Sequence, residues 1–205
     1  REEDPTSPVS VYGKTMVAAE QVLADWLPQA CVLRISLPMG VSFNGHAGAI
    51  DWIQSRFRKN RPATLYFDEV RTPTYTDCLN RLFERVLALD LAGVYHCGGP
   101  RRLSLYEIAQ IVNRVGGYDP ALLQGCLRHE AGPVPPRAGD VSMDSSRLAA
   151  ALGGAPFDPW PYDEALVPAD RRWHERRDGL RGSPELLAEV LYRNPLRHSA
   201  DQRLA

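Results

Sequence analysis

The feature that most constrains the fold is an early alternation of short apolar runs with longer amphipathic stretches. The apolar runs have the length of buried strands and occupy residues 31–36, 64–67 and 94–97. Apolar side chains recur at helical spacing over about 11–27, 47–58 and 76–90. The second helix is expected to turn Ile50, Trp52, Ile53 and Phe57 inward. Strands that alternate with helices favour an α/β fold.

The second half of the chain is less regular. Ser104 and Glu107 have the spacing of a capping box, which predicts a helix from there to the Gly116-Gly117 pair. A further strand is expected within 122–129, a short helix over 146–152 and a closing helix over 185–192. These later pieces favour a small mixed lobe beside the main sheet.

Composition excludes several classes of protein. A chain of 205 residues that is 44% hydrophobic can bury the core of about one domain. Its net charge of -1 argues against a general nucleic-acid binder. Cys31, Cys78, Cys97 and Cys126 form no C-x-x-C pair, so we expect reduced thiols and no metal site. With no apolar run of membrane-spanning length, the sequence predicts a cytoplasmic protein.

One helix carries a candidate catalytic side chain. Ser10 can cap a helix that begins with Tyr12-Gly13-Lys14-Thr15-Met16. A tyrosine hydroxyl can exchange a proton with a carbonyl or alcohol oxygen, but a free phenol has a pKa of about 10 and needs a nearby cation. This stretch resembles the Tyr-x-x-x-Lys motif of short-chain dehydrogenases/reductases, with Met16 in place of the lysine. Lys14 lies about 200° round the helix from Tyr12 and cannot simply replace it.

The order of further motifs extends this resemblance along the chain. The pieces are Glu3-Asp4-Pro5 to Pro8, Tyr12-Gly13-Lys14-Thr15, Glu20, Leu33-Arg34-Ile35-Ser36, Phe67-Asp68, Pro73-Thr74-Tyr75 with Asp77 and Leu79, Gly93-Val94-Tyr95-His96, Ser104-Leu105-Tyr106-Glu107, Pro136-Arg137 and Met143-Asp144-Ser145-Ser146-Arg147-Leu148. Together they resemble the C-terminal portion of the dTDP-4-dehydrorhamnose reductase family, an extended short-chain dehydrogenase/reductase family.

The resemblance implies a fold and a division of the chain. We expect the C-terminal part of a Rossmann-type doubly wound sheet plus a small mixed α/β substrate-binding lobe over 1–153. Residues 154–205 are then an irregular and helical extension. The sequence contains no G-x-G-x-x-G turn for a pyrophosphate. The chain is therefore expected to be part of a longer protein.

The same resemblance implies an activity. It is NAD(P)H-dependent reduction of a 4-keto-deoxysugar nucleotide, with NADP or NAD as cofactor, a nucleotide sugar as substrate and a homodimer as one assembly compatible with the family. Tyr12 maps onto the proton donor. Met16, Ser36 and Pro38 map onto the cofactor site, and the predicted substrate contacts are Asn44, Arg71, Thr72 and Thr74. Neither a membrane nor a nucleic acid is expected as a partner.

Alternative interpretations stay open. Because Met16 replaces the lysine, the protein is either an enzyme or a non-catalytic binding or regulatory subunit, and an epimerase or dehydratase is a further alternative. Arg34 is expected to pair with a carboxylate or face a polar cleft, and His96 to be a core histidine. The arginine pairs 171–172 and 176–177 alternate with acidic residues and predict a solvated face.

Overall fold

The computed structural model describes residues 1–40, 42, 44, 48–177, 179 and 181–196. Its helices are α1 (Val11–Trp26), α2 (Asp51–Arg58), α3 (Thr76–Leu89), α4 (Leu105–Val115), α5 (Ser146–Leu152) and α6 (Pro184–Leu187), with a π-helical turn over Ala188–Tyr192. Its strands are β1 (Cys31–Ile35), β2 (Pro38–Met39), β3 (Ala63–Tyr66), β4 (Val70–Arg71), β5 (Thr74–Tyr75), β6 (Gly93–Cys97), β7 (Leu103–Ser104) and β8 (Leu123–Cys126). The predicted α/β class is confirmed.

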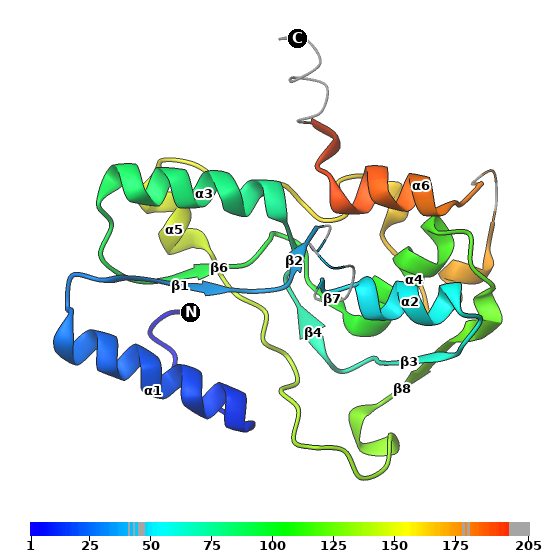
Figure 1. Cartoon of the computed structure of the whole chain (residues 1–205), viewed down its shortest axis with the longest axis horizontal. Coiled ribbons are helices and arrows are strands. Elements are labelled where there is room, and N and C mark those ends of the chain that lie inside the picture. Colours follow the sequence, from blue (N-terminus) through cyan, green and yellow to red (C-terminus); the bar gives the residue numbers. More distant parts are fainter. Residues whose placement is uncertain (41, 43, 45–47, 178, 180, 197–205) are drawn as a thin grey trace.

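Parallel pairing dominates the strands. β1 pairs with β6, β2 with β5 and β3 with β8, all in parallel, whereas the short β4 and β7 form an antiparallel ribbon. Figure 1 shows β1 and β6 as a layer with α1 on one side and α3 and α5 on the other. Parallel strands need crossover connections, and the connection that ends at β6 contains α3.

The core is centred on α4. Eight of its eleven residues are buried, and its predicted capping box forms between Ser104 and Glu107. The segment after residue 153 joins the same core through its buried aromatic and aliphatic side chains. The indole of Trp160 donates to the Leu191 carbonyl at 2.8 Å, and the Tyr75 hydroxyl donates to the Val190 carbonyl at 3.0 Å. These bonds fix the closing helical segment against β5 and the loop that contains Trp160.

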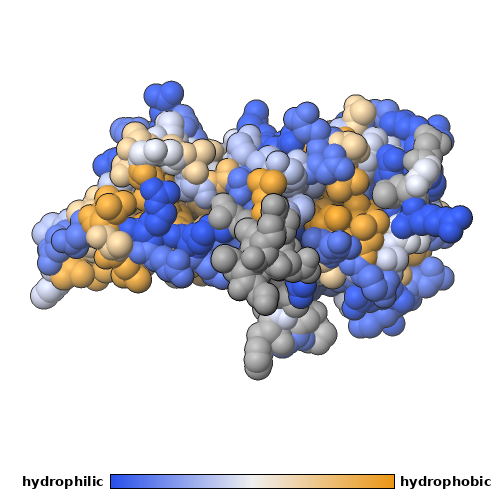
Figure 2. Space-filling view, turned by 90° about the horizontal axis from the view of Figure 1, so that it is seen from above, coloured by the Kyte–Doolittle hydropathy of each residue, from blue (hydrophilic) through white to orange (hydrophobic). Residues whose placement is uncertain are grey.

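Helix α1 is packed far more sparsely. Ser10 caps it as predicted, because its hydroxyl accepts from the Gly13 amide at 3.0 Å. None of its residues is buried, and Trp26 is 84% exposed. Figure 2 shows apolar surface at the left-hand end of the molecule, where the C-terminal ends of α1 and α3 lie. Leu27, Leu87 and Leu89 are exposed there as well.

Helix α2 corrects one detail of its predicted inner face. Ile50, Ile53 and Phe57 are buried as expected, but Trp52 is 51% exposed and lies beside the guanidinium of Arg56. Trp52 immediately precedes Ile53, so it lies about 100° away from the buried stripe. Its placement inside the core was therefore wrong.

Candidate functional site

Helix α1, which carries the Tyr12 hydroxyl, borders a cavity of about 560 Å³, here called the Tyr12 cavity. It is lined by residues 6–10 and 136–138, together with Tyr12, Gly13, Met16, Val17, Glu20, Arg34, Glu69, Arg71 and Val141. Tyr12 itself is 74% exposed. Tyr12, Met16 and Arg71, three of the predicted site residues, thus share one cavity.

A charged cluster of Glu69, Arg71 and Arg137 forms one wall of this cavity. Glu69 is only 2% exposed, and its Oε1 accepts from Arg71 at 2.8 Å. Arg137 donates to both oxygens of the same carboxylate, each at 3.0 Å. Arg71 also donates to the carbonyls of Val70 and Gly139, which leaves its guanidinium held from three sides. Two cations therefore share a single anion.

The two guanidinium groups have different surroundings. Burial lowers the pKa of Arg71, and the neighbouring charge of Arg137 adds to this effect. For Arg137, hydrogen bonding to Glu69 is the main cause and raises its pKa. The difference follows from depth, because Arg137 is the more exposed of the two and Arg71 lies between the carboxylate and backbone carbonyls. Both groups remain positively charged at neutral pH.

A second cavity lies on the other side of the same cluster. This aromatic cavity has a volume of about 420 Å³ and shares Glu69, Arg71 and Arg137 with the Tyr12 cavity. Its other lining residues are mostly apolar or aromatic: Leu37, Ala49, Trp52, Ile53, Thr64, Leu65, Tyr66 and Leu105. The guanidinium of Arg137 lies 5.3 Å from the centre of the Tyr66 ring. The charged cluster thus separates an aromatic compartment from one that contains a tyrosine hydroxyl.

Arg34 confirms the prediction of a carboxylate partner. Its Nε and Nη2 atoms donate to Glu20 of α1, with the shortest distance 2.7 Å, and hydrogen bonding to Glu20 raises its pKa. Its Nη1 lies 3.3 Å from Nε2 of His96, which is buried as predicted. Burial lowers the pKa of His96. This ion pair connects α1 to the strand layer.

The remaining predicted site residues lie near the ends of β1 and β2. The Ser36 hydroxyl accepts from the amide of Thr72 at 3.2 Å and lies 3.1 Å from the Thr72 hydroxyl. Pro38 pairs with Thr74 across the β2–β5 strands. The Thr74 hydroxyl is buried with no hydrogen-bond partner within the described part of the chain. None of these four residues lines either cavity.

The last of the predicted site residues is Asn44. Asn44 is exposed, and residues 43 and 45–47 beside it lie outside the described part of the chain. Glu69 and Arg137 were not predicted as site residues. Arg137 follows Pro136 in one of the motifs that carry the resemblance. That motif indicated that Arg137 belongs to the family pattern, but it did not indicate a contact with Glu69.

Among the described residues, no group of three or more His, Cys, Asp or Glu side chains could hold a metal ion. None of the helices described is long and apolar enough to cross a membrane.

Comparison with known proteins places this geometry in context. The profile of the family described as RmlD substrate binding domain matches residues 1–168. The chain is 26% identical to a dTDP-4-dehydrorhamnose reductase from Mycolicibacterium smegmatis, over 77% of this chain and 48% of that protein. It is 23% identical to methionine adenosyltransferase 2 subunit beta from Danio rerio, over 85% of this chain and 57% of that protein. The chain therefore spans about half the length of the curated relatives it matches.

Solved structures show the same fold. A dTDP-4-dehydrorhamnose reductase from Bacillus anthracis, in complex with NADP, matches 78% of this chain and 55% of its own, with a TM-score of 0.67 at 18% identity. A dTDP-glucose 4,6-dehydratase from Streptomyces venezuelae, with NAD bound, has a TM-score of 0.65 at 20% identity and is matched over 90% of this chain and 56% of its own. The family profile confirms the resemblance that the sequence motifs predicted, and the solved structures confirm the Rossmann-type α/β fold.

Proposed function

Because the chain belongs to the RmlD substrate binding domain family, we propose that it holds a nucleotide sugar across the Glu69–Arg71–Arg137 cluster. The observation that carries this proposal is that two cavities of different chemistry share these three residues. A nucleotide sugar has the matching order of parts: a flat base, a diphosphate and a sugar. In this arrangement the base lies in the aromatic cavity, the diphosphate on the arginines and the sugar in the Tyr12 cavity.

The charges of the cluster suit the diphosphate. Guanidinium groups bind phosphate oxygens through two parallel N–H bonds, and charge-assisted bonds of this kind are about twice as strong as neutral ones. Glu69 neutralises one of the two cations, so the cluster keeps a net charge of about +1. The buried carboxylate also holds both side chains in place before a ligand arrives, which lowers the entropic cost of binding.

In the enzymatic form of this proposal, Tyr12 acts as general acid in the reduction of a 4-keto group. A bound nicotinamide cofactor would supply the hydride that is added to the carbonyl carbon. The Tyr12 hydroxyl donates its proton to the carbonyl oxygen, so the product is an alcohol. Met16, Ser36 and Pro38 are the proposed neighbours of the nicotinamide. Ser36 and Pro38 follow the carboxyl end of β1, where ligands of open α/β sheets bind.

A second candidate function is a binding or regulatory subunit without catalysis. Two observations favour it. Met16 places a thioether on the helix face where the motif of reductases has a lysine, and relatives of the chain are named methionine adenosyltransferase 2 subunit beta. Both candidates need the same nucleotide-sugar site, and they differ in whether Tyr12 transfers a proton. An epimerase or dehydratase is a further alternative, which would have the same fold and act on the same class of ligand.

Binding can be measured by titration calorimetry with dTDP-glucose on the longest natural form of the protein. Arg71→Gln and Arg137→Gln should each raise the Kd at least about tenfold, because each removes a charge-assisted contact. Arg61→Gln, an exposed arginine outside both cavities, is the matched control and should leave the Kd unchanged. Equal Kd values for all four proteins would contradict the proposed diphosphate site.

Turnover separates the two candidate functions. With NADPH and a 4-keto nucleotide sugar, Tyr12→Phe should lower kcat by about 10²–10⁴-fold if Tyr12 is the proton donor. Tyr162→Phe changes an exposed tyrosine outside both cavities and serves as control. Met16→Lys should raise kcat in an enzyme that is merely slow. No turnover in the wild type and in Met16→Lys, with binding intact, would favour the regulatory subunit.

A further inference from the structure

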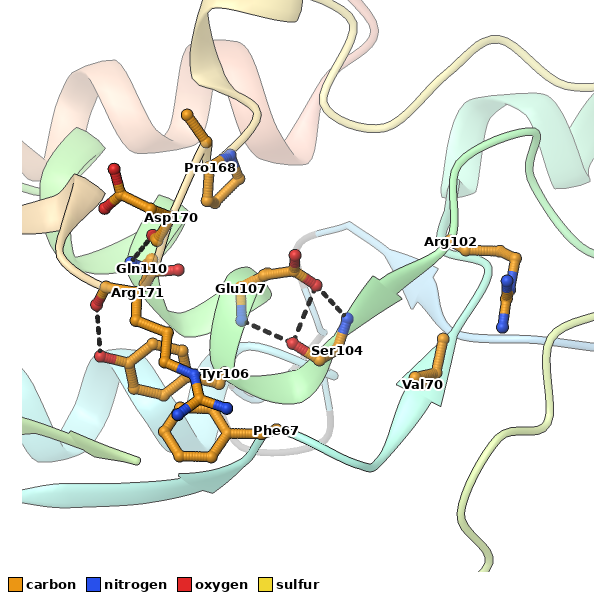
Figure 3. A pocket seen from close by; sticks show the side chains of 11 residues that line it. Phe67, Val70, Arg102, Ser104, Tyr106, Glu107, Gln110, Pro168, Asp170 and Arg171 are labelled. Atoms are coloured by element: carbon orange, nitrogen blue, oxygen red, sulfur yellow. Dashed lines mark hydrogen bonds between the residues drawn. The ribbon is translucent and has the colours of Figure 1, made fainter. Parts of the chain in front are cut away.

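The β4–β7 ribbon borders a further cavity on the face opposite Arg71. Its register pairs Val70 with Ser104 and Arg71 with Leu103, and side chains alternate between the two faces of a strand. Arg71 faces the cavities described above. Val70 and Ser104 line a different cavity of about 360 Å³, bounded also by the start of α4 and by residues 168–171 (Figure 3). We call it the rear cavity, and it shares no lining residue with the other two.

The walls of the rear cavity are fixed by bonds within the protein. The Tyr106 hydroxyl donates to the carbonyl of Arg171 at 2.9 Å, and Gln110 Nε2 donates to the carbonyl of Asp170 at 3.0 Å. Tyr106 also meets Phe67 edge to face, with ring centres 4.7 Å apart. Helix α4 therefore holds the 168–171 loop in position, and the cavity is formed in the structure without a ligand.

Arg171 presents an uncommitted cation to this cavity. Figure 3 shows its guanidinium over the Phe67 ring, and the distance to the ring centre is 3.9 Å. No acceptor in the described part of the chain receives its N–H groups. Its neighbours differ, because Arg172 is paired with Glu175 at 2.7 Å and Arg176 with Asp170 at 2.8 Å. Arg171, Arg172 and Arg176 are all exposed, as the predicted solvated face requires, and Arg171 differs in that its guanidinium lies over an aromatic ring.

The same cavity contains unused acceptors. One carboxylate oxygen of Glu107 accepts from the amide and hydroxyl of Ser104, at 2.6 and 2.8 Å. The other points away from Ser104 in Figure 3 and has no partner within the described residues. Gln110 is fully buried, and its Oε1 likewise has no partner among them. Gln110 is enclosed too fully for a ligand to reach its Oε1, so the half-buried Glu107, which lines the cavity, is the acceptor within reach of a ligand.

From these three features we infer that the rear cavity binds a small zwitterion of the α-amino-acid type with an apolar side chain. Its carboxylate pairs with Arg171, and its ammonium group donates to the free oxygen of Glu107. Its side chain lies against Phe67, Val70 and Pro168, which supply the apolar part of the lining. This site lies on the opposite face of the ribbon from the proposed nucleotide-sugar site, and its existence does not depend on that proposal.

Three probes test the two charged contacts separately in titration calorimetry. L-Phenylalanine carries both charges, 3-phenylpropanoate lacks the ammonium group and 2-phenylethylamine lacks the carboxylate. We expect L-phenylalanine to bind at least about tenfold more tightly than either of the others, since each loses a charge-assisted contact. No binding of L-phenylalanine at millimolar concentration, or equal affinity for all three probes, would overturn the inference.

Matched variants assign the contacts to residues. Arg171→Gln should weaken L-phenylalanine binding about tenfold or more, whereas Arg172→Gln removes a neighbouring charge outside the lining and should not. Glu107→Gln keeps a capping residue that helices accept at this position but removes the carboxylate charge, so the helix should persist while affinity falls. Circular dichroism checks the fold of each variant. Equal weakening by Arg171→Gln and Arg172→Gln would refute the assignment and indicate a diffuse charge effect.

Discussion

Helices α1 and α4 begin in the same way and end up in opposite environments. Each has a serine N-cap whose hydroxyl accepts an amide three residues on, at 3.0 Å in α1 and 3.2 Å in α4. Yet α1 has no buried residue, while α4 is mostly buried. Local sequence therefore decides that a helix forms and where it starts. The elements that surround it decide whether its apolar residues leave water.

The contrast divides the candidate site into two parts. Tyr12 belongs to the sparsely packed helix, whereas Arg71 is part of the ribbon that leads into α4, and Glu69 immediately precedes that ribbon. Ligand binding through the arginines rests on the well-packed part of the molecule. Proton transfer rests on α1, which an ion pair between Glu20 and Arg34 joins to the strand layer.

The largest difference is expected between two carboxylates that each hold an arginine. Glu69→Gln removes a buried charge that satisfies Arg71 and Arg137, and should lower the free energy of unfolding by about 3 kcal/mol. Glu20→Gln breaks the more exposed pair with Arg34 and should cost about 1 kcal/mol or less. Urea denaturation of both variants measures this. Equal losses would mean that α1 is as firmly integrated as the ribbon.

A smaller difference is expected for matched apolar truncations. Val112→Ala in α4 empties fully buried space and should lower the free energy of unfolding by roughly 2 kcal/mol. Val22→Ala in α1 removes the same two carbons from an exposed position and should stay within about 0.5 kcal/mol of wild type. Thermal and urea unfolding compare the pair. A large loss for Val22→Ala would show that α1 is covered in solution.

The smallest effect is expected in the pH dependence of stability, through a histidine that contacts α4. Burial lowers the pKa of His174, whose Nδ1 lies 3.1 Å from Gln110. Above about pH 6.5 this histidine is neutral in both states and adds no slope. Below that pH the unfolded chain takes up a proton that the folded protein resists. Stability should therefore fall as the pH drops toward the folded pKa, by at most about 1.4 kcal/mol per pH unit.

A variant isolates the contribution of this histidine. His174→Asn should flatten part of the slope between pH 6.5 and 5, even if it lowers stability at every pH. His129→Asn alters an exposed histidine and should leave the slope as it is in wild type. Urea midpoints across this pH range provide the measurement. An unchanged slope in His174→Asn would assign the dependence to other groups, among them His96, whose pKa burial also lowers.

The elements that could be predicted from the sequence are those that residues close together in the chain determine. The caps at Ser10 and Ser104 and the helices that follow them were predicted from residues three or four apart, and both form. The partner class of Arg34 was predicted because a strand-centre arginine needs a carboxylate. Such inferences require only near neighbours or a general energetic rule.

The rest of the site depends on contacts that a single sequence does not encode visibly. Arg137 reaches Glu69 across 68 residues, and nothing in its own neighbourhood indicates that partner. Trp52 lies next to the buried stripe of its helix, so the helical period alone did not show that its side chain is exposed. Arg177 was predicted to be solvated, although it bonds to the Asn113 side chain at 2.8 Å. The two cavities on either side of the cluster arise only when these distant segments are assembled.

The brevity of the β4–β7 ribbon limits how this gene segment can change length. Only two residue pairs define which side chain faces which cavity. Deleting or inserting one codon between Glu69 and Thr72 would shift the register by one residue and exchange the two faces of the strand. An arginine would then replace Val70 on the rear side. Point substitutions can alter either face independently, but single-codon insertions and deletions cannot. Among descendants of this sequence, the segment should therefore vary in composition while its length stays constant.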